Sequence, residues 1–147
     1  MRIMSTIADR QAEIVAELSA ANSWQARYKR IIQLGRDLPE FPEEHRTDAN
    51  KVKGCQSQVW LHAEPQADGT VKFVGDSDAS IVKGLVALVL RAFSGGTPME
   101  IMTAQTTFVD QLGLGENLSA TRANGLSAML KQIKLYGVVL SAVTGQS

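Results

Sequence analysis

The side chain with the most reactive chemistry in this sequence belongs to Cys55. It follows Gly54 and precedes the polar residues Gln56, Ser57 and Gln58. A structural cysteine normally lies within an apolar pattern, so this setting indicates a loop that carries a nucleophilic thiolate. Gly54 permits a positive φ and gives the loop mobility. The alternative, an inert thiol that packs as a small hydrophobe, stays open from composition alone.

Two lysines precede the cysteine and bear on its reactivity. The ammonium groups of Lys51 and Lys53 would lower the pKa of the Cys55 thiol if they approach the sulfur. The 147 residues contain no second cysteine, which excludes an intramolecular disulfide, a dithiol redox pair and a multi-cysteine metal site. Cys55 therefore acts without a second thiol from its own chain.

The chain has two histidines that could assist a thiol. A cysteine hydrolase needs a histidine base, but neither His45, in a charged loop, nor His62, on a predicted strand, has a protease-like spacing from Cys55. A metal site built from these three residues and a carboxylate has no ligand-pair spacing behind it. We therefore predict no metal site and surface histidines. A hydrolase that uses His62 is a distant alternative.

Three charged residues further along the chain have both a structural and a functional interpretation. Asp76 and Asp78 follow Gly75 without the spacing of a dinucleotide loop, a P-loop or a calcium loop, so we predict that they cap a helix. Arg122 falls in the first turn of the last predicted helix, where a cation is unfavourable. This position suggests a carboxylate partner, and an exposed, solvated arginine is the alternative.

The elements that must position these residues are helices around a small hairpin. Val59–Ala63 and Val71–Val74 alternate with period two around Asp68 and Gly69, which predicts an antiparallel hairpin. Strands grouped between runs of helices predict an α+β fold rather than a parallel sheet. Helices are predicted after a capping box at Thr6 and Asp9, after Asn22 or Ser23, after Asp78 to about Phe93, after Thr97 and after Ser119 or Thr121.

Length and charge limit the classes of function. The 147 residues predict a single domain, 1–147, and 15 basic against 15 acidic residues argue against non-specific nucleic-acid binding. No apolar core of signal-peptide length begins the sequence, so we expect a cytoplasmic protein, with Met1 or Met4 as its start. The apolar stretch Ile81–Phe93 is interrupted by Lys83 and Arg91 and is too short to span a membrane.

Several ordered motifs resemble one family of proteins. The segment Gly54–Trp60 is followed about 20 residues later by Gly75–Ala79 and then by Ser119–Leu126, in the order found in the SufE family of sulfur-acceptor proteins. The ordered set is far more specific than any single motif. The match also includes Ile81–Leu85, Trp24, Tyr28, Ile32, Leu34, Gly35, Leu38 and Pro39.

The resemblance implies a fold like that of the IscU scaffold, with a small antiparallel sheet flanked by helices. It implies that Cys55 takes sulfur from the persulfide of a pyridoxal-phosphate cysteine desulfurase of the SufS or CsdA kind. The chain would stimulate that enzyme, hold no cofactor itself, and pass sulfur to a SufB-type scaffold for iron–sulfur cluster assembly. A regulatory module that carries no sulfur is the alternative. The residues expected to support the loop or the partner are Gly54, Gln56, Ser57, Trp60, Asp76 and Arg122.

Overall fold

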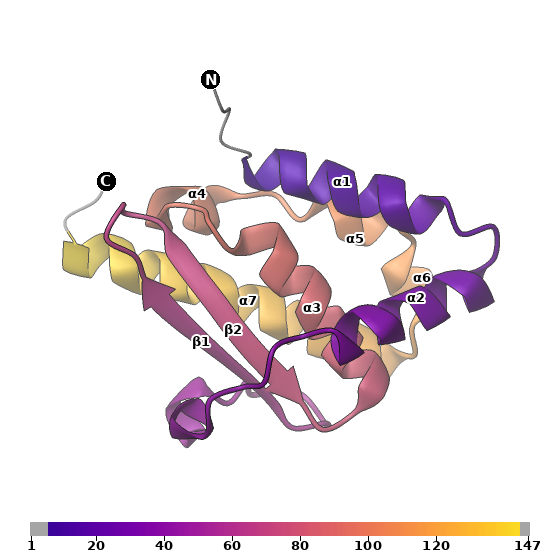
Figure 1. Cartoon of the computed structure of the whole chain (residues 1–147), viewed down its shortest axis with the longest axis horizontal. Helices are drawn as coiled ribbons and strands as arrows, with labels where there is room; N and C mark the ends of the chain where they lie inside the picture. Colours follow the sequence, from indigo (N-terminus) through magenta and orange to yellow (C-terminus); the bar gives the residue numbers. More distant parts are fainter. Residues whose placement is uncertain (1–5, 145–147) are drawn as a thin grey trace.

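A computed structural model of the chain describes residues 6–144, so both candidate starts, Met1 and Met4, lie outside the described residues. It contains a two-stranded antiparallel sheet and helices, which confirms the predicted α+β class (Figure 1). The elements are α1 (Ile7–Ser19), α2 (Trp24–Arg36), the 3₁₀ helices η1 (Glu43–His45) and η2 (Asp48–Asn50), β1 (Val59–Pro65), β2 (Val71–Ser77), α3 (Ser80–Phe93), α4 (Pro98–Thr103), α5 (Thr107–Gln111), α6 (Leu114–Asn117) and α7 (Ala120–Thr144).

The helix starts follow local signals in the sequence. Thr6 and Asp9 form the predicted capping box of α1, and Ser23 accepts a hydrogen bond from the Ala26 amide at the start of α2. Thr97 and Glu100 form a second capping box, at α4. These side chains satisfy amides that would otherwise lack partners in the first helical turn.

The prediction that Asp76 and Asp78 cap the helix after the hairpin is wrong. The N-cap residue of α3 is Ala79, and no side chain caps this helix. Asp76 belongs to β2, where it lies opposite Trp60, and the Asp78 carboxylate accepts a hydrogen bond from the Gln58 amide at 3.0 Å. Neither carboxylate is therefore used to cap α3: Asp76 binds Arg46 and Lys83, and Asp78 binds the Cys55 loop.

The predicted antiparallel hairpin is present and has two distinct faces. β1 pairs with β2 from Val59 opposite Ser77 to Pro65 opposite Val71. Val59 and Leu61 are buried, whereas the alternate residues Trp60 and His62 are half-buried. The alternation places the first pair toward the core and the second pair on the opposite face.

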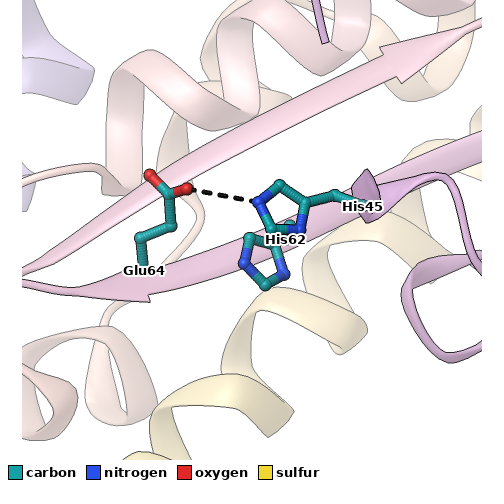
Figure 2. Close-up of side chains that lie close together, drawn as sticks. All are labelled: His45, His62 and Glu64. Atoms are coloured by element: carbon teal, nitrogen blue, oxygen red, sulfur yellow. Dashed lines mark ion pairs between the residues drawn. The ribbon is translucent and has the colours of Figure 1, made fainter. Parts of the chain in front are cut away.

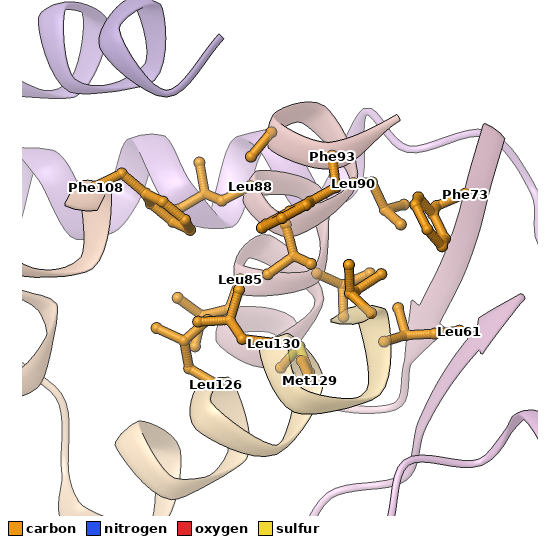
Figure 3. Close-up of a cluster of buried hydrophobic side chains, with 14 of the residues drawn as sticks. Leu61, Phe73, Leu85, Leu88, Leu90, Phe93, Phe108, Leu126, Met129 and Leu130 are labelled. Carbon is orange, nitrogen blue, oxygen red and sulfur yellow. The ribbon is translucent and has the colours of Figure 1, made fainter. Parts of the chain in front are cut away.

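Helix α3 forms the centre of the molecule. It packs against α1, α2, α7 and β2 (Figure 1), and Gly84 allows α2 to approach closely, because a Cβ there would collide with the Ile31 carbonyl. Figure 3 shows side chains of α3 meeting those of the hairpin, α5 and α7 in one buried cluster. The labelled members include Leu61, Phe73, Leu85, Leu88, Phe93, Phe108, Leu126 and Met129.

Among the described helices, α7 alone is long and apolar enough to cross a membrane, over Ala120–Val143. This is weak evidence for a span, because the core helix of a globular protein passes the same test of length and composition. Only 33% of the 18-residue apolar segment of α7 is buried, although the helix packs against α3, α4 and β1. Its uncovered apolar side chains are Leu135, Val138, Val139 and Val143.

Candidate functional site

Cys55 lies on a short loop whose two ends are held by backbone hydrogen bonds. The Val52 amide donates to the Val59 carbonyl at 2.8 Å, a contact that we call the loop clasp. A second backbone hydrogen bond, from the Asp78 amide to the Gln58 carbonyl at 3.2 Å, holds the C-terminal end of the loop. The segment between these anchors belongs to no helix or strand, as the polar sequence around Cys55 predicted.

Gly54 has the positive φ that the sequence predicted, +90°. Few residues other than glycine adopt this conformation, and it turns the chain just before Cys55. Gln56 is exposed and Ser57 is half-buried. Both line the same small cavity as the cysteine. The predicted loop residues are therefore brought together around the thiol.

The thiol itself points toward the start of α7. Cys55 Sγ donates a weak hydrogen bond to the Gly125 carbonyl at 3.6 Å. The adjoining cavity has a volume of about 20 Å³, which is enough for about one water-sized group. Besides the loop residues, its lining consists of Val82, Thr121, Arg122 and Gly125.

Burial raises the pKa of the Cys55 thiol above its ordinary value. Burial is the cause of this shift, and no lowering by Lys51 or Lys53 offsets it in this conformation. In the position described, the thiol is therefore more fully protonated at neutral pH than a free cysteine. Its nucleophilicity is correspondingly low until the loop moves.

Arg122 lies beside the cysteine, and its partner is a hydroxyl rather than a carboxylate. Its Nη1 donates to the Tyr28 hydroxyl oxygen at 2.7 Å, and its guanidinium carbon lies 5.9 Å from the centre of that ring. Within residues 6–144 no ion pair of Arg122 occurs. The expected carboxylate partner is thus missing from the described residues, and the cation remains available at the rim of the cavity.

Asp76 does not line the cavity but holds a charged cluster next to it. Its carboxylate accepts from Arg46 at 2.8 Å and from the Ser77 amide at 2.8 Å, and lies 3.4 Å from Lys83 Nζ. Burial raises the pKa of Asp76, but the hydrogen bonds from Arg46 and Ser77 and the charge of Lys83 outweigh it and keep the pKa low. Lys83 follows Val82, so the cluster adjoins the cavity wall.

Arg46 is a residue of this region that the sequence did not single out. Besides Asp76 it binds Glu43 at 2.8 Å, and its guanidinium lies 4.8 Å from the Trp60 ring centre and 5.2 Å from that of Phe41. Trp60 thus packs on Arg46 and is not part of the cavity lining. No local pattern marked Arg46, because its contacts with Asp76 and Trp60 join distant parts of the chain.

Comparisons with known proteins agree on one family. A family model described as "SufE: Fe-S metabolism associated domain" matches residues 12–136. An uncharacterized SufE-like protein of Rhizobium meliloti (strain 1021) is 47% identical over 126 residues, covering 83% of this chain and 90% of the relative. A second such protein, from Rhizobium etli, is 44% identical over 134 residues, covering 88% and 90%.

Similarity to solved structures supports the fold. The solution structure of a hypothetical protein from Thermus thermophilus superposes with a TM-score of 0.75 over 90% of this chain and 96% of that chain. At 18% sequence identity this likeness shows the fold alone.

Proposed function

The chain belongs to the SufE family, and on that premise we propose that it accepts sulfur on Cys55 from the persulfide of a cysteine desulfurase. The partner is a pyridoxal-phosphate enzyme of the SufS or CsdA kind, which the chain stimulates by removing its product. A SufB-type scaffold for iron–sulfur cluster assembly then receives the sulfur. Family membership associates the chain with Fe–S metabolism and with a desulfurase.

The chemical step is a redox-neutral transfer of one sulfur atom from a persulfide to a thiol. The Cys55 thiol first loses its proton, and the thiolate attacks the outer sulfur of the partner's persulfide. A sulfur–sulfur bond forms on Cys55 as the bond within the partner's persulfide breaks. The partner's thiolate leaves and takes up a proton. One sulfur atom has moved, and no external oxidant or reductant is consumed.

The observation that carries this proposal is the position of the lone cysteine on a glycine-hinged loop above a small cavity. A loop closed at its base by the clasp can extend its tip toward a partner without disturbing the sheet. In the inward position the cavity of about 20 Å³ has room for the added sulfur. Shelter matters there because a persulfide is readily oxidised or reduced by small molecules.

Mass spectrometry of the intact chain tests the proposal directly. The protein is incubated with a desulfurase and cysteine, and its mass is measured before and after a reductant. We expect a reductant-sensitive gain of one sulfur atom on the wild type and none on Cys55→Ser. Absence of this gain on the wild type would overturn sulfur acceptance.

The same preparation separates sulfur transfer from regulation without transfer. A sulfur acceptor loses its stimulation of the desulfurase when Cys55 becomes serine. Stimulation retained at the wild-type level by Cys55→Ser would instead support the regulatory module. Arg122→Gln offers a further comparison, because it keeps the thiol but removes the cation at the cavity rim and its hydrogen bond to Tyr28.

A further inference from the structure

Two histidines and a glutamate meet on the face of the hairpin that points away from the core (Figure 2). His62 and Glu64 are alternate residues of β1 and so share that face. His45, from η1, covers them. Its Nε2 lies 3.5 Å from a Glu64 carboxylate oxygen, and one ligand-type atom from each of the three residues lies within 4.8 Å of the others.

The two imidazoles are stacked. Their ring centres are 3.7 Å apart, with 16° between the planes. The stack holds the two rings side by side, so imidazole nitrogens from η1 and β1 lie near the Glu64 carboxylate. Imidazole nitrogen is a common ligand of Zn²⁺.

Asn50 contacts the His62 ring and the backbone of His45. Its Oδ1 lies 3.4 Å from His62 Nδ1 and also accepts from the Tyr136 hydroxyl at 3.1 Å. Its Nδ2 donates to the His45 carbonyl at 2.9 Å. Because Oδ1 is only an acceptor, the contact requires the proton on Nδ1 of His62 and leaves the Nε2 lone pair open. Metal-binding histidines are commonly fixed by such a second hydrogen bond.

We propose that His45, His62 and Glu64 form a binding site for a divalent first-row transition ion such as Zn²⁺, separate from the Cys55 cavity. Two imidazoles and one carboxylate suit such ions, and water completes the coordination. Mg²⁺ and Ca²⁺ prefer oxygen ligands throughout. Cys55 is not part of the group.

Metal binding requires a side-chain adjustment within the group. Ligand atoms around a tetrahedral Zn²⁺ are about 3.3 Å apart; His45 and Glu64 lie 3.5 Å apart, whereas the whole group spans up to 4.8 Å. Stacked rings direct their lone pairs in nearly parallel directions, so the His45 ring, which Asn50 does not hold, turns about its Cβ–Cγ bond to meet the ion. Both histidine side chains are half-buried, and that of His45 is 21% exposed, so solvent reaches the site.

Sequence reasoning missed this site because its ligands come from two separate elements. Seventeen residues separate His45 from His62, and no short ligand motif links them. The bound ion would join η1 to β1 on either side of the Cys55 loop. It would thereby add a fixed point to the segment that leads into the loop.

Zinc and cobalt titrations of the untagged, metal-stripped full chain test the proposal. We expect one Zn²⁺ per chain by calorimetry and, with Co²⁺, visible absorption bands without a thiolate charge-transfer band. His62→Gln and Glu64→Gln each weaken Zn²⁺ binding by roughly tenfold or more. The matched control Glu13→Gln removes an exposed carboxylate of α1 and leaves binding unchanged.

Further variants make the result decisive. Cys55→Ser retains full Zn²⁺ affinity, which keeps this test independent of the proposed sulfur transfer. His45→Gln tests the ligand from η1, and the circular dichroism of each metal-free variant shows that it is folded. Absence of Zn²⁺ binding by the wild type, wild-type affinity in folded His62→Gln, or loss of affinity in Cys55→Ser would each overturn the site.

Discussion

At the scale of single residues, the Cys55 thiol has two opposing requirements. It must ionise to attack a persulfide, yet in the inward position burial raises its pKa. The hydrogen bond to the Gly125 carbonyl also favours the thiol over the thiolate, because only the protonated form can donate. Reactivity and shelter therefore belong to two different positions of the loop.

The raised pKa predicts slow alkylation of the free protein. Below the raised pKa the thiolate fraction is smaller than that of a free cysteine, so Cys55 reacts more slowly with iodoacetamide at neutral pH. The midpoint of its rate against pH lies above that of a small thiol. The urea-unfolded chain serves as reference. A folded-state midpoint at or below the unfolded one would contradict the buried position.

Gly125→Ala should stabilise α7 but reduce the space in the Cys55 cavity. A Cβ there lies 3.6 Å from Cys55 Sγ, an ordinary contact, so α7 gains about 1 kcal/mol of helix propensity. The space for an added sulfur shrinks, and we expect the Cys55 persulfide to be reduced faster by dithiothreitol. Gly115→Ala, a helical position with open space around it, is the control. Unchanged persulfide lifetime in Gly125→Ala would argue against storage in this cavity.

At the scale of elements, one backbone conformation shapes the Cys55 loop, and one charged cluster joins β2 to α3 and to the segment before the loop. Gly54 turns the chain with φ +90°, and Asp76, on the adjoining strand, binds the side chains of Arg46 and Lys83. Each can be altered without touching the thiol. The two substitutions that follow separate loop geometry from the charges that surround it.

Gly54→Ala should free the cysteine from its inward position. A Cβ at this φ costs about 1 kcal/mol or more, so the loop populates other conformations and alkylation of Cys55 becomes faster. Gly69 in the hairpin turn has nearly the same φ, +87°, and open space around it. Gly69→Ala therefore has a similar cost in stability and leaves the alkylation rate unchanged. Equal rates in both variants would contradict the assigned hinge.

Asp76→Asn should weaken the fold in a pH-dependent way. The pKa of Asp76 in the folded chain lies below its unfolded value, so its contribution is complete above about pH 4 and is lost as the pH falls through the lowered pKa. We expect a loss of about 1–2 kcal/mol near neutral pH. Urea unfolding at a series of pH values should show the difference in unfolding free energy between variant and wild type decreasing as the pH becomes acidic.

The comparison for this series is an exposed aspartate. Asp48→Asn alters a carboxylate of η2 that has no ion pair among the described residues, so it leaves stability almost unchanged. A gap between Asp76→Asn and wild type that stays constant down to acid pH would mean that the ionised carboxylate is not what stabilises the cluster.

Several helix starts and the glycine hinge of the Cys55 loop could be predicted from the sequence, because their signals span only a few neighbouring residues. The capping box of Thr6 and the positive φ of Gly54 depend on their immediate surroundings. Contacts between distant residues were not predictable. Arg46 reaches Asp76 across 30 residues, and Arg122 reaches Tyr28 across 94. Only the tertiary packing of the elements decides which of these side chains meet.

At the scale of the whole molecule, the formal net charge is zero, with 15 basic and 15 acidic residues. Long-range attraction of a partner by net charge is therefore weak, and association depends on local patches and apolar contacts. Apolar side chains are uncovered on α7, at Leu135, Val138, Val139 and Val143. This distribution predicts how association responds to salt.

The rate of association with a desulfurase should depend little on ionic strength. Between about 50 mM and about 500 mM salt we expect a change of less than about tenfold, because screening acts on a molecule without net charge. Stopped-flow fluorescence, with the tryptophans as probes, measures this rate. A steep fall with added salt would show that a local charged patch directs the encounter.

The loop clasp also limits how far Cys55 can reach toward a partner. Cys55 lies three residues beyond Val52, and an extended chain spans at most about 3.3–3.6 Å per residue, so its Cα lies at most about 11 Å from that of Val52. The Cys55 side chain carries Sγ somewhat further. A reactive sulfur buried deeper than this combined reach would be reached only if the clasp opened or the first residues of β1 unpaired. The backbone hydrogen bond from Val52 to Val59 thus limits which partner clefts are shallow enough to be served.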